Sequence, residues 1–112
     1  MSQPTDTVVR TAETAWKTLR TPGISIKILR DDKATGASTF LLRLEPGARV
    51  PAHNHPAGEE LFVLEGDFQV GPHRLASGDY LYTPPEGKHA AGSEGGCLVL
   101  VTLPRPVEIL AG

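Results

Sequence analysis

The stretch from Gly47 to Gly66 reads GARVPAHNHPAGEELFVLEG, and it decides how the rest of the chain is interpreted. His53 and His55 are two residues apart, and Glu59 follows after a Pro-Ala-Gly turn. Residues i and i+2 of a β-strand project from the same face, so both imidazoles can reach one point. The turn can bring a carboxylate back toward that point. Two histidines and a carboxylate that converge in this way are a typical coordination shell for a divalent metal.

Short apolar segments separated by turn residues surround this stretch on both sides. Glu45-Pro46-Gly47 predicts a type II turn before it, and Glu65-Gly66-Asp67 predicts a turn into a hairpin partner at 68–70. Further turns are expected at Gly71-Pro72 and at 76–79, and Pro104 and Pro106 limit the segment after them to an edge position. Strands are predicted over 24–30, 38–44, 49–55, 60–65, 80–83, 88–93, 97–103 and 107–110. About nine or ten short strands without a convincing helix predict an all-β sandwich or barrel.

The first residues are harder to assign. Apolar side chains from Val8 to Leu19 fit a helical stripe, but the many threonines there disfavour a helix. Both conformations stay open at this point. We expect residues 1–15 to form a tail or arm that packs Trp16 against the body, and residues 16–112 to form a single domain.

Composition and charge exclude several classes of protein. The chain has 112 residues, 39% apolar and 21% charged, and a formal net charge of −2 without a basic cluster. We therefore expect neither nucleic acid nor a membrane surface as a partner. No apolar run approaches the roughly 18 residues of a membrane span, and no signal peptide is readable, so the cytoplasm is the expected location. The single cysteine, Cys97, lies in an apolar strand, where a buried thiol is expected.

Two further histidines, His73 and His89, are candidates for the fourth metal ligand. His89 follows the Pro84–Gly87 turn at the start of a strand, where its side chain can re-enter a barrel. His73 lies next to Gly71-Pro72 at a hairpin tip, where a solvated imidazole is expected. His89 is therefore the predicted fourth ligand. Between the adjacent glutamates, Glu60 is expected at the surface, because neighbouring residues of a strand point to opposite faces.

These motifs resemble those of the cupin superfamily. The family's first motif is G-x5-H-x-H-x3,4-E-x6-G, which this chain matches at Gly47, His53, His55, Glu59 and Gly66. The second is G-x5-P-x-G-x2-H-x3-N, which it matches at Gly78, Pro84 and His89, whereas Glu86 occupies the glycine position and Ser93 the asparagine position. The stretch also resembles the cupin domain of zinc-binding anti-sigma factors, although the 46 residues before Gly47 do not read as a sigma-binding helical domain, so anti-sigma activity is not expected.

The resemblance implies a single double-stranded β-helix (jelly-roll) barrel that binds one divalent transition metal through His53, His55, Glu59 and His89. The donor set suits Fe, Mn, Ni, Co, Cu or Zn and does not select among them. It implies an enzyme of dioxygenase-like or isomerase-like type that acts on a small oxygenated organic molecule, with a non-catalytic sensing module as the alternative. It also implies a homodimer formed through sheet edges.

Two further predictions concern apolar and aromatic side chains of the strands. Leu61 and Val63 share the face of Glu59 and are expected to line an apolar pocket beside it. Four aromatic side chains are expected in the core: Phe40, Phe62, Tyr80 and Tyr82.

Overall fold

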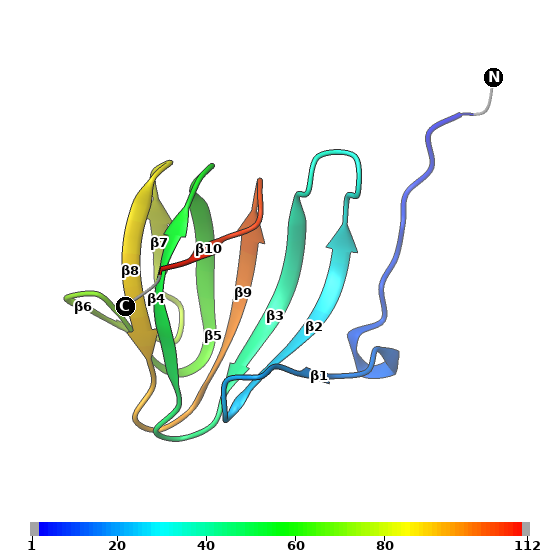
Figure 1. Cartoon of the computed structure of the whole chain (residues 1–112). Helices are drawn as coiled ribbons and strands as arrows, with labels where there is room; N and C mark the ends of the chain where they lie inside the picture. Colours follow the sequence, from blue (N-terminus) through cyan, green and yellow to red (C-terminus); the bar gives the residue numbers. More distant parts are fainter. Residues whose placement is uncertain (1–2, 111–112) are drawn as a thin grey trace.

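The fold is an all-β barrel with a short N-terminal arm, in a computed structural model that describes residues 3–110 (Figure 1). A 3-10 helix, η1 (Thr11–Glu13), precedes the first strand. The strands are β1 (Lys17–Thr18), β2 (Ile24–Asp31), β3 (Ser38–Leu44), β4 (Arg49–His55), β5 (Glu59–Val70), β6 (His73–Ala76), β7 (Tyr80–Thr83), β8 (Gly87–Gly92), β9 (Cys97–Leu103) and β10 (Glu108–Ile109). The predicted fold class, a jelly-roll barrel, is confirmed.

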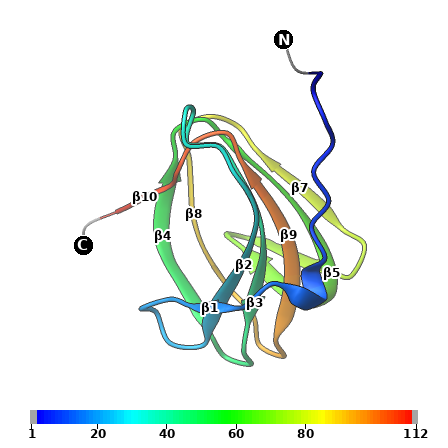
Figure 2. The same cartoon turned by 90° about the vertical axis from the view of Figure 1, so that its right-hand side faces the viewer.

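The strands form one antiparallel sheet that curls on itself. Its order is β1-β2-β3-β9-β5-β8-β4-β10, and β6 and β7 also pair with β5. Figure 2 shows β4 and β8 on one side of the barrel and β2, β3 and β9 on the other. The apolar strand predicted over 97–103 is central in the sheet, since β9 pairs with both β3 and β5. The proline-flanked last strand lies at an edge, also as predicted, where β10 pairs with β4.

Strand β5 belongs to both layers of the barrel, and here one sequence prediction is wrong. Glu65-Gly66-Asp67 is not a hairpin turn but a bend inside a continuous strand. Before the bend β5 pairs with β7 and β9, and after it with β6 and β8. The register with β9 shifts between Val63 and Glu65, and Gly66 has a φ of 82°. A bulge bends a strand without ending it, and Gly66 remains paired with Cys97 of β9 just after the bulge.

Alternate residues of the strands fill the barrel. β9 follows this rule throughout, with Cys97, Val99, Val101 and Leu103 buried. The predicted burial of the Cys97 thiol is confirmed. Phe40 packs against the core, as expected. Phe62, Tyr80 and Tyr82 do not, because their side chains are 40%, 54% and 58% exposed on the outer face of the sheet.

The N-terminal segment forms an arm rather than an α-helix. After η1, β1 pairs with β2, and the ring of Trp16 lies over two cationic side chains, with its centroid 4.0 Å from Arg43 and 4.7 Å from Lys27. The predicted packing of Trp16 against the body is confirmed. The division of the chain after residue 15 stays a prediction, and residues 1–2 and 111–112 of the two predicted segments lie outside the described residues.

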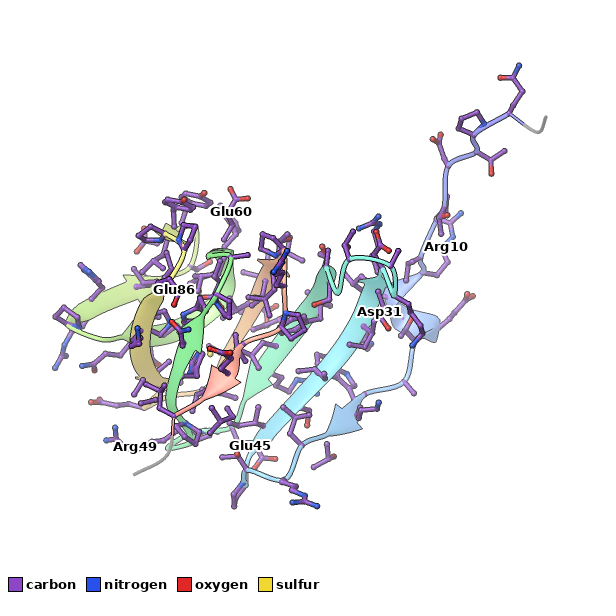
Figure 3. The ribbon with its side chains drawn as sticks, turned by 45° about the horizontal axis from the view of Figure 1, so that its top comes forward. Arg10, Asp31, Glu45, Arg49, Glu60 and Glu86 are labelled. Atoms are coloured by element: carbon purple, nitrogen blue, oxygen red, sulfur yellow. The ribbon has the colours of Figure 1, made fainter. Side chains whose placement is uncertain are left out.

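The barrel has two ends, and the turn between β4 and β5 lies at one of them. Figure 3 shows Glu60 and Glu86 at this end and Glu45 and Arg49 at the other. The predicted type II turn at the second end is confirmed, because Gly47 has a φ of 84° and Ala48 N donates to the Glu45 carbonyl. Within residues 3–110 no helix has the length and apolar character needed to cross a membrane.

Candidate metal centre

Two neighbouring strands bring three histidines together inside the barrel. His53 and His55 occupy alternate positions of β4 and face inward, with exposed fractions of 6% and 0%. His89 of β8 is the direct cross-strand partner of His53. One ring nitrogen from each histidine lies within 4.8 Å of those of the other two. The predicted convergence of these three side chains is therefore found in the structure.

Glu59 completes the cluster from a third strand. It is the first residue of β5, directly after a turn in which Gly58 N donates to the His55 carbonyl. Its two carboxyl oxygens lie 3.5 Å from Nε2 of His55 and 3.6 Å from Nε2 of His89. These distances are longer than a hydrogen bond, so the carboxyl group faces the imidazoles without bonding to them.

Backbone carbonyls fix the tautomers of the two β4 histidines. Nδ1 of His53 lies 2.7 Å from the Pro51 carbonyl oxygen, and Nδ1 of His55 lies 2.7 Å from that of Gly87. A carbonyl oxygen only accepts, so each Nδ1 carries the proton that it donates. In the neutral ring the lone pair is then on Nε2, which is the nitrogen that faces the cluster and can bind a metal.

The side chains of the cluster offer buried donor atoms that suit a divalent ion. Among the described residues, Nε2 of His55 and Oε1 of Glu59 are fully buried and have no hydrogen-bond partner. Buried polar atoms are nearly always paired, and unpaired ones carry a desolvation cost. A cation bound between the imidazoles and the carboxylate would satisfy both atoms, and nitrogen and oxygen donors suit such an ion.

Burial also shifts the ionisation of the cluster toward neutral forms. Removal from water raises the pKa of Glu59 to about 7. Removal from water, followed by the nearby His55 and His53, lowers the pKa of His89 to about 4, and burial likewise lowers the pKa of His55. At neutral pH the His55 and His89 rings are therefore uncharged, and their contacts with Glu59 are not ion pairs.

A small cavity adjoins the cluster. Its volume is about 40 Å³, and it is lined by Leu42, Val50, His53, Glu59, Leu61, Phe68, His89, Ala91 and Val101. The prediction that Leu61 lines an apolar pocket is confirmed, whereas Val63 is buried in the core outside this lining. A larger groove of about 210 Å³ lies along Gly47–Arg49 and Ala90–Glu94, but no imidazole lines it. We therefore place the candidate site at the smaller cavity, where the candidate ligands His53, Glu59 and His89 line the wall.

A polar network next to the site was not predicted. Asn54 is 5% exposed, and its Nδ2 donates to Oε1 of Glu108 at 2.8 Å and to Oε2 of Glu86 at 3.2 Å. Glu86 is the residue that replaces the motif glycine, and it keeps the left-handed backbone with a φ of 71°. Its amide donates to the His55 carbonyl at 2.7 Å, so this turn supports a candidate ligand. The departure from the motif was the available signal for Glu86, but nothing in the sequence pointed to Glu108.

The other polar residues singled out from the sequence lie at the surface. Glu60 is exposed and accepts a hydrogen bond from the Tyr80 hydroxyl at 2.6 Å, which raises the pKa of that tyrosine. His73 is exposed on β6, outside the histidine cluster. Ser93, at the asparagine position of the second motif, is buried and donates to the Asp67 carbonyl at 2.6 Å.

A jelly-roll barrel with inward-facing histidines on adjacent strands defines the class of cupin proteins. Residues 4–105 match the family described as the ChrR Cupin-like domain. The chain belongs to this family.

The similar proteins include two of known structure and one plant protein. A candidate acetylacetone dioxygenase from Methylibium petroleiphilum PM1 superposes with a TM-score of 0.90 at 20% identity, covering 99% of this chain and 85% of that chain. The anti-sigma ChrR of Rhodobacter sphaeroides, solved in complex with SigE, gives a TM-score of 0.72 at 29% identity over 84% of this chain and 51% of that chain. The Arabidopsis thaliana DNA damage-repair/toleration protein DRT102 is 34% identical over 74 residues, which are 61% of this chain and 23% of that protein. The matched segment thus spans about a quarter of the length of DRT102.

Proposed function

We propose that the protein binds one divalent transition metal ion through His53, His55, His89 and Glu59. The observation that carries the proposal is the unpaired, buried state of His55 Nε2 and Glu59 Oε1 beside two further imidazoles. Three neutral imidazoles and one carboxylate would reduce the charge of a divalent ion to about +1. The set contains no thiolate and is compatible with Fe, Mn, Ni, Co, Cu or Zn.

We further propose that the site acts on a small oxygenated organic molecule. A bound ion would supply Lewis acidity and, if redox-active, electrons for dioxygen chemistry. The chain itself would bind and shield the substrate, because the cavity wall beside Glu59 and His89 is made largely of apolar side chains. A volume of about 40 Å³ requires either a very small ligand or movement of that wall.

The class of reaction proposed is dioxygenase-like or isomerase-like. The candidate acetylacetone dioxygenase shares the fold along nearly the whole chain, and this supports a β-diketone or a similar chelating compound as the first substrate to test. His53 and His55 would enter the reaction as oriented ligands, since their Nδ1 protons are held by carbonyl groups.

A second candidate function is a sensing module without catalysis. The similarity to ChrR, at 29% identity, favours this alternative, because that protein was solved bound to a protein partner. In this case the metal or a small ligand would order the barrel, and another protein would respond to the change. We also propose a cytoplasmic location, which rests on the sequence features alone.

Metal content tests the site directly. The protein is purified without a metal-affinity tag, and bound metal is measured by mass spectrometry beside the variants His53→Ala and His89→Ala. We expect about one ion per wild-type chain and none in either variant. The exposed His73 supplies the control, and His73→Ala should retain the ion. Full retention by both site variants would refute the site.

Oxygen consumption separates the two candidate functions. We expect the metal-loaded protein to consume oxygen with β-diketone or catechol compounds, and His89→Ala to lose this activity. The sensing module would be favoured if the protein bound metal at full stoichiometry without turnover. Its binding to another protein would then change without any substrate being consumed.

A further inference from the structure

The wall of the barrel is open between β7 and the first half of β8. In the described part of the chain, β7 pairs with β5 alone. β8 pairs with β4 at Gly87 to His89, whereas its pairing with β5 reaches only Ala91 and Gly92. Within residues 3–110 no pairing joins β7 to β8, and Figure 2 shows the two strands diverging from their shared turn.

A cavity of about 460 Å³ lies in this opening, and its volume is in the usual range for ligand pockets. All four residues of β7 and the first three of β8 line it, together with the tip of the β5–β6 hairpin at 71–73. Consecutive residues of a strand point to opposite faces, so a cavity that touches all of them follows the free edge of the strand. We call this cavity the edge pocket.

His89 connects the edge pocket to the candidate metal centre. It lines both the edge pocket and the cavity of about 40 Å³ beside Glu59. The side chain of His89 is 12% exposed, whereas that of His55 is fully buried. The edge pocket therefore gives a substrate a route to the cluster, and it has room for the part of the substrate that the small cavity cannot hold.

The charge of the lining favours an anion. Besides two imidazoles, the only basic side chain in the lining is that of Lys88, and no carboxylate is part of the lining. Nζ of Lys88 donates to the Glu86 carbonyl oxygen at 3.2 Å, and no ion pair with an acidic side chain is found for it among the described residues. An ammonium group has three protons to donate, so Lys88 can also hold a carboxylate by charge-assisted hydrogen bonds.

The rings beside Lys88 favour a flat, apolar body on that anion. Tyr80 and Tyr82 line the edge pocket and are 54% and 58% exposed. Aromatic rings stack on other flat groups at little entropic cost and contribute a large contact area. The Tyr80 hydroxyl is already bonded to Glu60, which leaves Tyr82 as the ring without a hydrogen bond between described side chains.

We propose that the edge pocket binds the substrate of the candidate metal centre, and that this substrate is a flat organic anion such as an aromatic carboxylate, held by Lys88 at its charged group and by Tyr82 at its ring. The role of the metal in this inference rests on the proposed function. Binding of the anion itself requires only the lining of the edge pocket, so the two can be tested separately.

Benzoate and benzyl alcohol, which share a ring and differ in charge, test the role of Lys88. Binding is followed through backbone amide signals in proton–nitrogen correlation spectra. We expect benzoate to shift the signals of 80–83 and 87–89, and Lys88→Gln to weaken benzoate about fivefold while benzyl alcohol changes by less than about twofold. Lys33→Gln is the matched control, since the Lys33 side chain is 90% exposed in the turn between β2 and β3, and it should bind benzoate like the wild type.

Three results of this titration would overturn the edge pocket as an anion site. They are the absence of any benzoate response, shifts confined to other strands, and an equal loss of benzoate binding in Lys88→Gln and Lys33→Gln.

A second set of variants tests the ring contact. Tyr82→Ala should weaken benzoate at least about threefold, and Tyr82→Phe should retain binding, because the ring and not the hydroxyl makes the contact. Phe62→Ala is the control, since Phe62 is 40% exposed outside the lining of the edge pocket. Circular dichroism establishes that each variant is folded. Equal loss in Phe62→Ala and Tyr82→Ala would refute the ring contact.

Titrations of the metal-free and the zinc-loaded protein separate this inference from the proposed function. We expect benzoate to shift the same backbone signals in both forms, and also the ring signals of His89. Loss of the metal site with an intact benzoate response would contradict the proposed function and leave the edge pocket as a binding site. Stoichiometric zinc without a benzoate response would refute the edge pocket alone, and benzoate binding without any change at His89 would refute its link to the metal centre.

Discussion

Glu59 shows how the site is poised at the level of single residues. Its carboxyl group is 7% exposed, receives no hydrogen bond, and has a pKa raised to about 7 by burial. Ionisation of Glu59 therefore opposes folding of the metal-free protein. A bound cation would remove this penalty. The metal-free protein is therefore less stable because of Glu59, and metal binding would restore the lost free energy of unfolding.

The variant Glu59→Gln should separate stability from metal binding. The folded-state pKa of Glu59 is about 7 and the ordinary value is 4.5, so above pH 7 the ionised carboxylate destabilises the fold by up to about 3 kcal/mol. We expect the metal-free variant to gain stability toward urea at pH 8 and to bind metal more weakly than the wild type. At pH 4, where both states of the wild type are protonated, the gain should vanish. A variant less stable than the wild type at pH 8 would contradict this account.

His89 makes the opposite contribution to the pH dependence. Its folded-state pKa is about 4 against an ordinary 6.5, so the unfolded chain binds the proton more tightly. Above pH 6.5 His89 is neutral in both the folded and the unfolded state and costs no stability. As the pH falls from 6.5 toward 4, the unfolded chain takes up the proton first, so the free energy of unfolding decreases. Between pH 4.5 and 6.5 Glu59 and His89 therefore oppose each other. We expect metal-free Glu59→Gln to lose stability more steeply on acidification in this window than the wild type, as measured by urea unfolding.

Three of the candidate ligands, His53, His55 and Glu59, were predictable because their geometry is local. The parity of β4 aims His53 and His55 at one point, and the turn at 56–58 returns Glu59 to it. The Asn54 network could not be predicted. Glu108 is 54 residues from Asn54 in the chain, and only the pairing of β10 with β4 brings the two side chains together. Tyr82 was wrongly expected in the core for a similar reason: side chains alternate along its strand, but the sequence does not show which of the two faces points inward.

Strand β5 illustrates the limits of prediction at the level of an element. Glu65-Gly66-Asp67 has the composition of a hairpin turn, yet β5 continues through it: the bulge against β9 lies between Val63 and Glu65, and Gly66, with a left-handed backbone, stays paired with Cys97. Turn residues report a local backbone conformation, in this case a φ of 82°, and not the direction of the chain beyond it. The direction is set by β6 and β8, which pair with the second half of the strand.

Alanine at Gly66 should disrupt this bend. An added Cβ would collide with the Gly96 carbonyl group, in addition to the cost of a left-handed backbone. Gly78 is the matched control, because it has a φ of 92° with no atom near the position of a Cβ. We expect Gly78→Ala to cost about 1 kcal/mol and Gly66→Ala about 1–3 kcal/mol more. Equal free energies of unfolding for the two variants would argue against close packing at the bulge.

At the level of the whole molecule, the candidate metal would join three strands. Its candidate ligands come from β4, β5 and β8, and β5 pairs with β8 only at Gln69 and Val70. Sequence analysis predicted the barrel because turn spacing and parity are periodic. It did not predict that Phe62, Tyr80 and Tyr82 are exposed, because the sequence does not show which face of β5 and β7 turns toward the barrel interior.

Metal should therefore stabilise the fold as a unit. A ligand that binds only the folded state, present at 100 times its dissociation constant, stabilises a protein by about 2.7 kcal/mol. We expect the melting temperature to rise with metal concentration and to fall on addition of a chelator, and His55→Ala to abolish both responses. Calorimetry provides the measurement. A melting temperature unaffected by either treatment would show that the metal does not contribute to folding.

The carbonyl groups that hold the rings of His53 and His55 have a spectroscopic consequence. Their Nδ1 protons sit in 2.7 Å bonds within a buried site, so they exchange slowly with solvent and should give resolved downfield signals in a proton NMR spectrum. These two resonances would report the tautomers of the candidate ligands before any metal is added. A titration with a diamagnetic ion such as zinc would shift both signals together, and the order in which different metals compete could then be followed at single imidazoles.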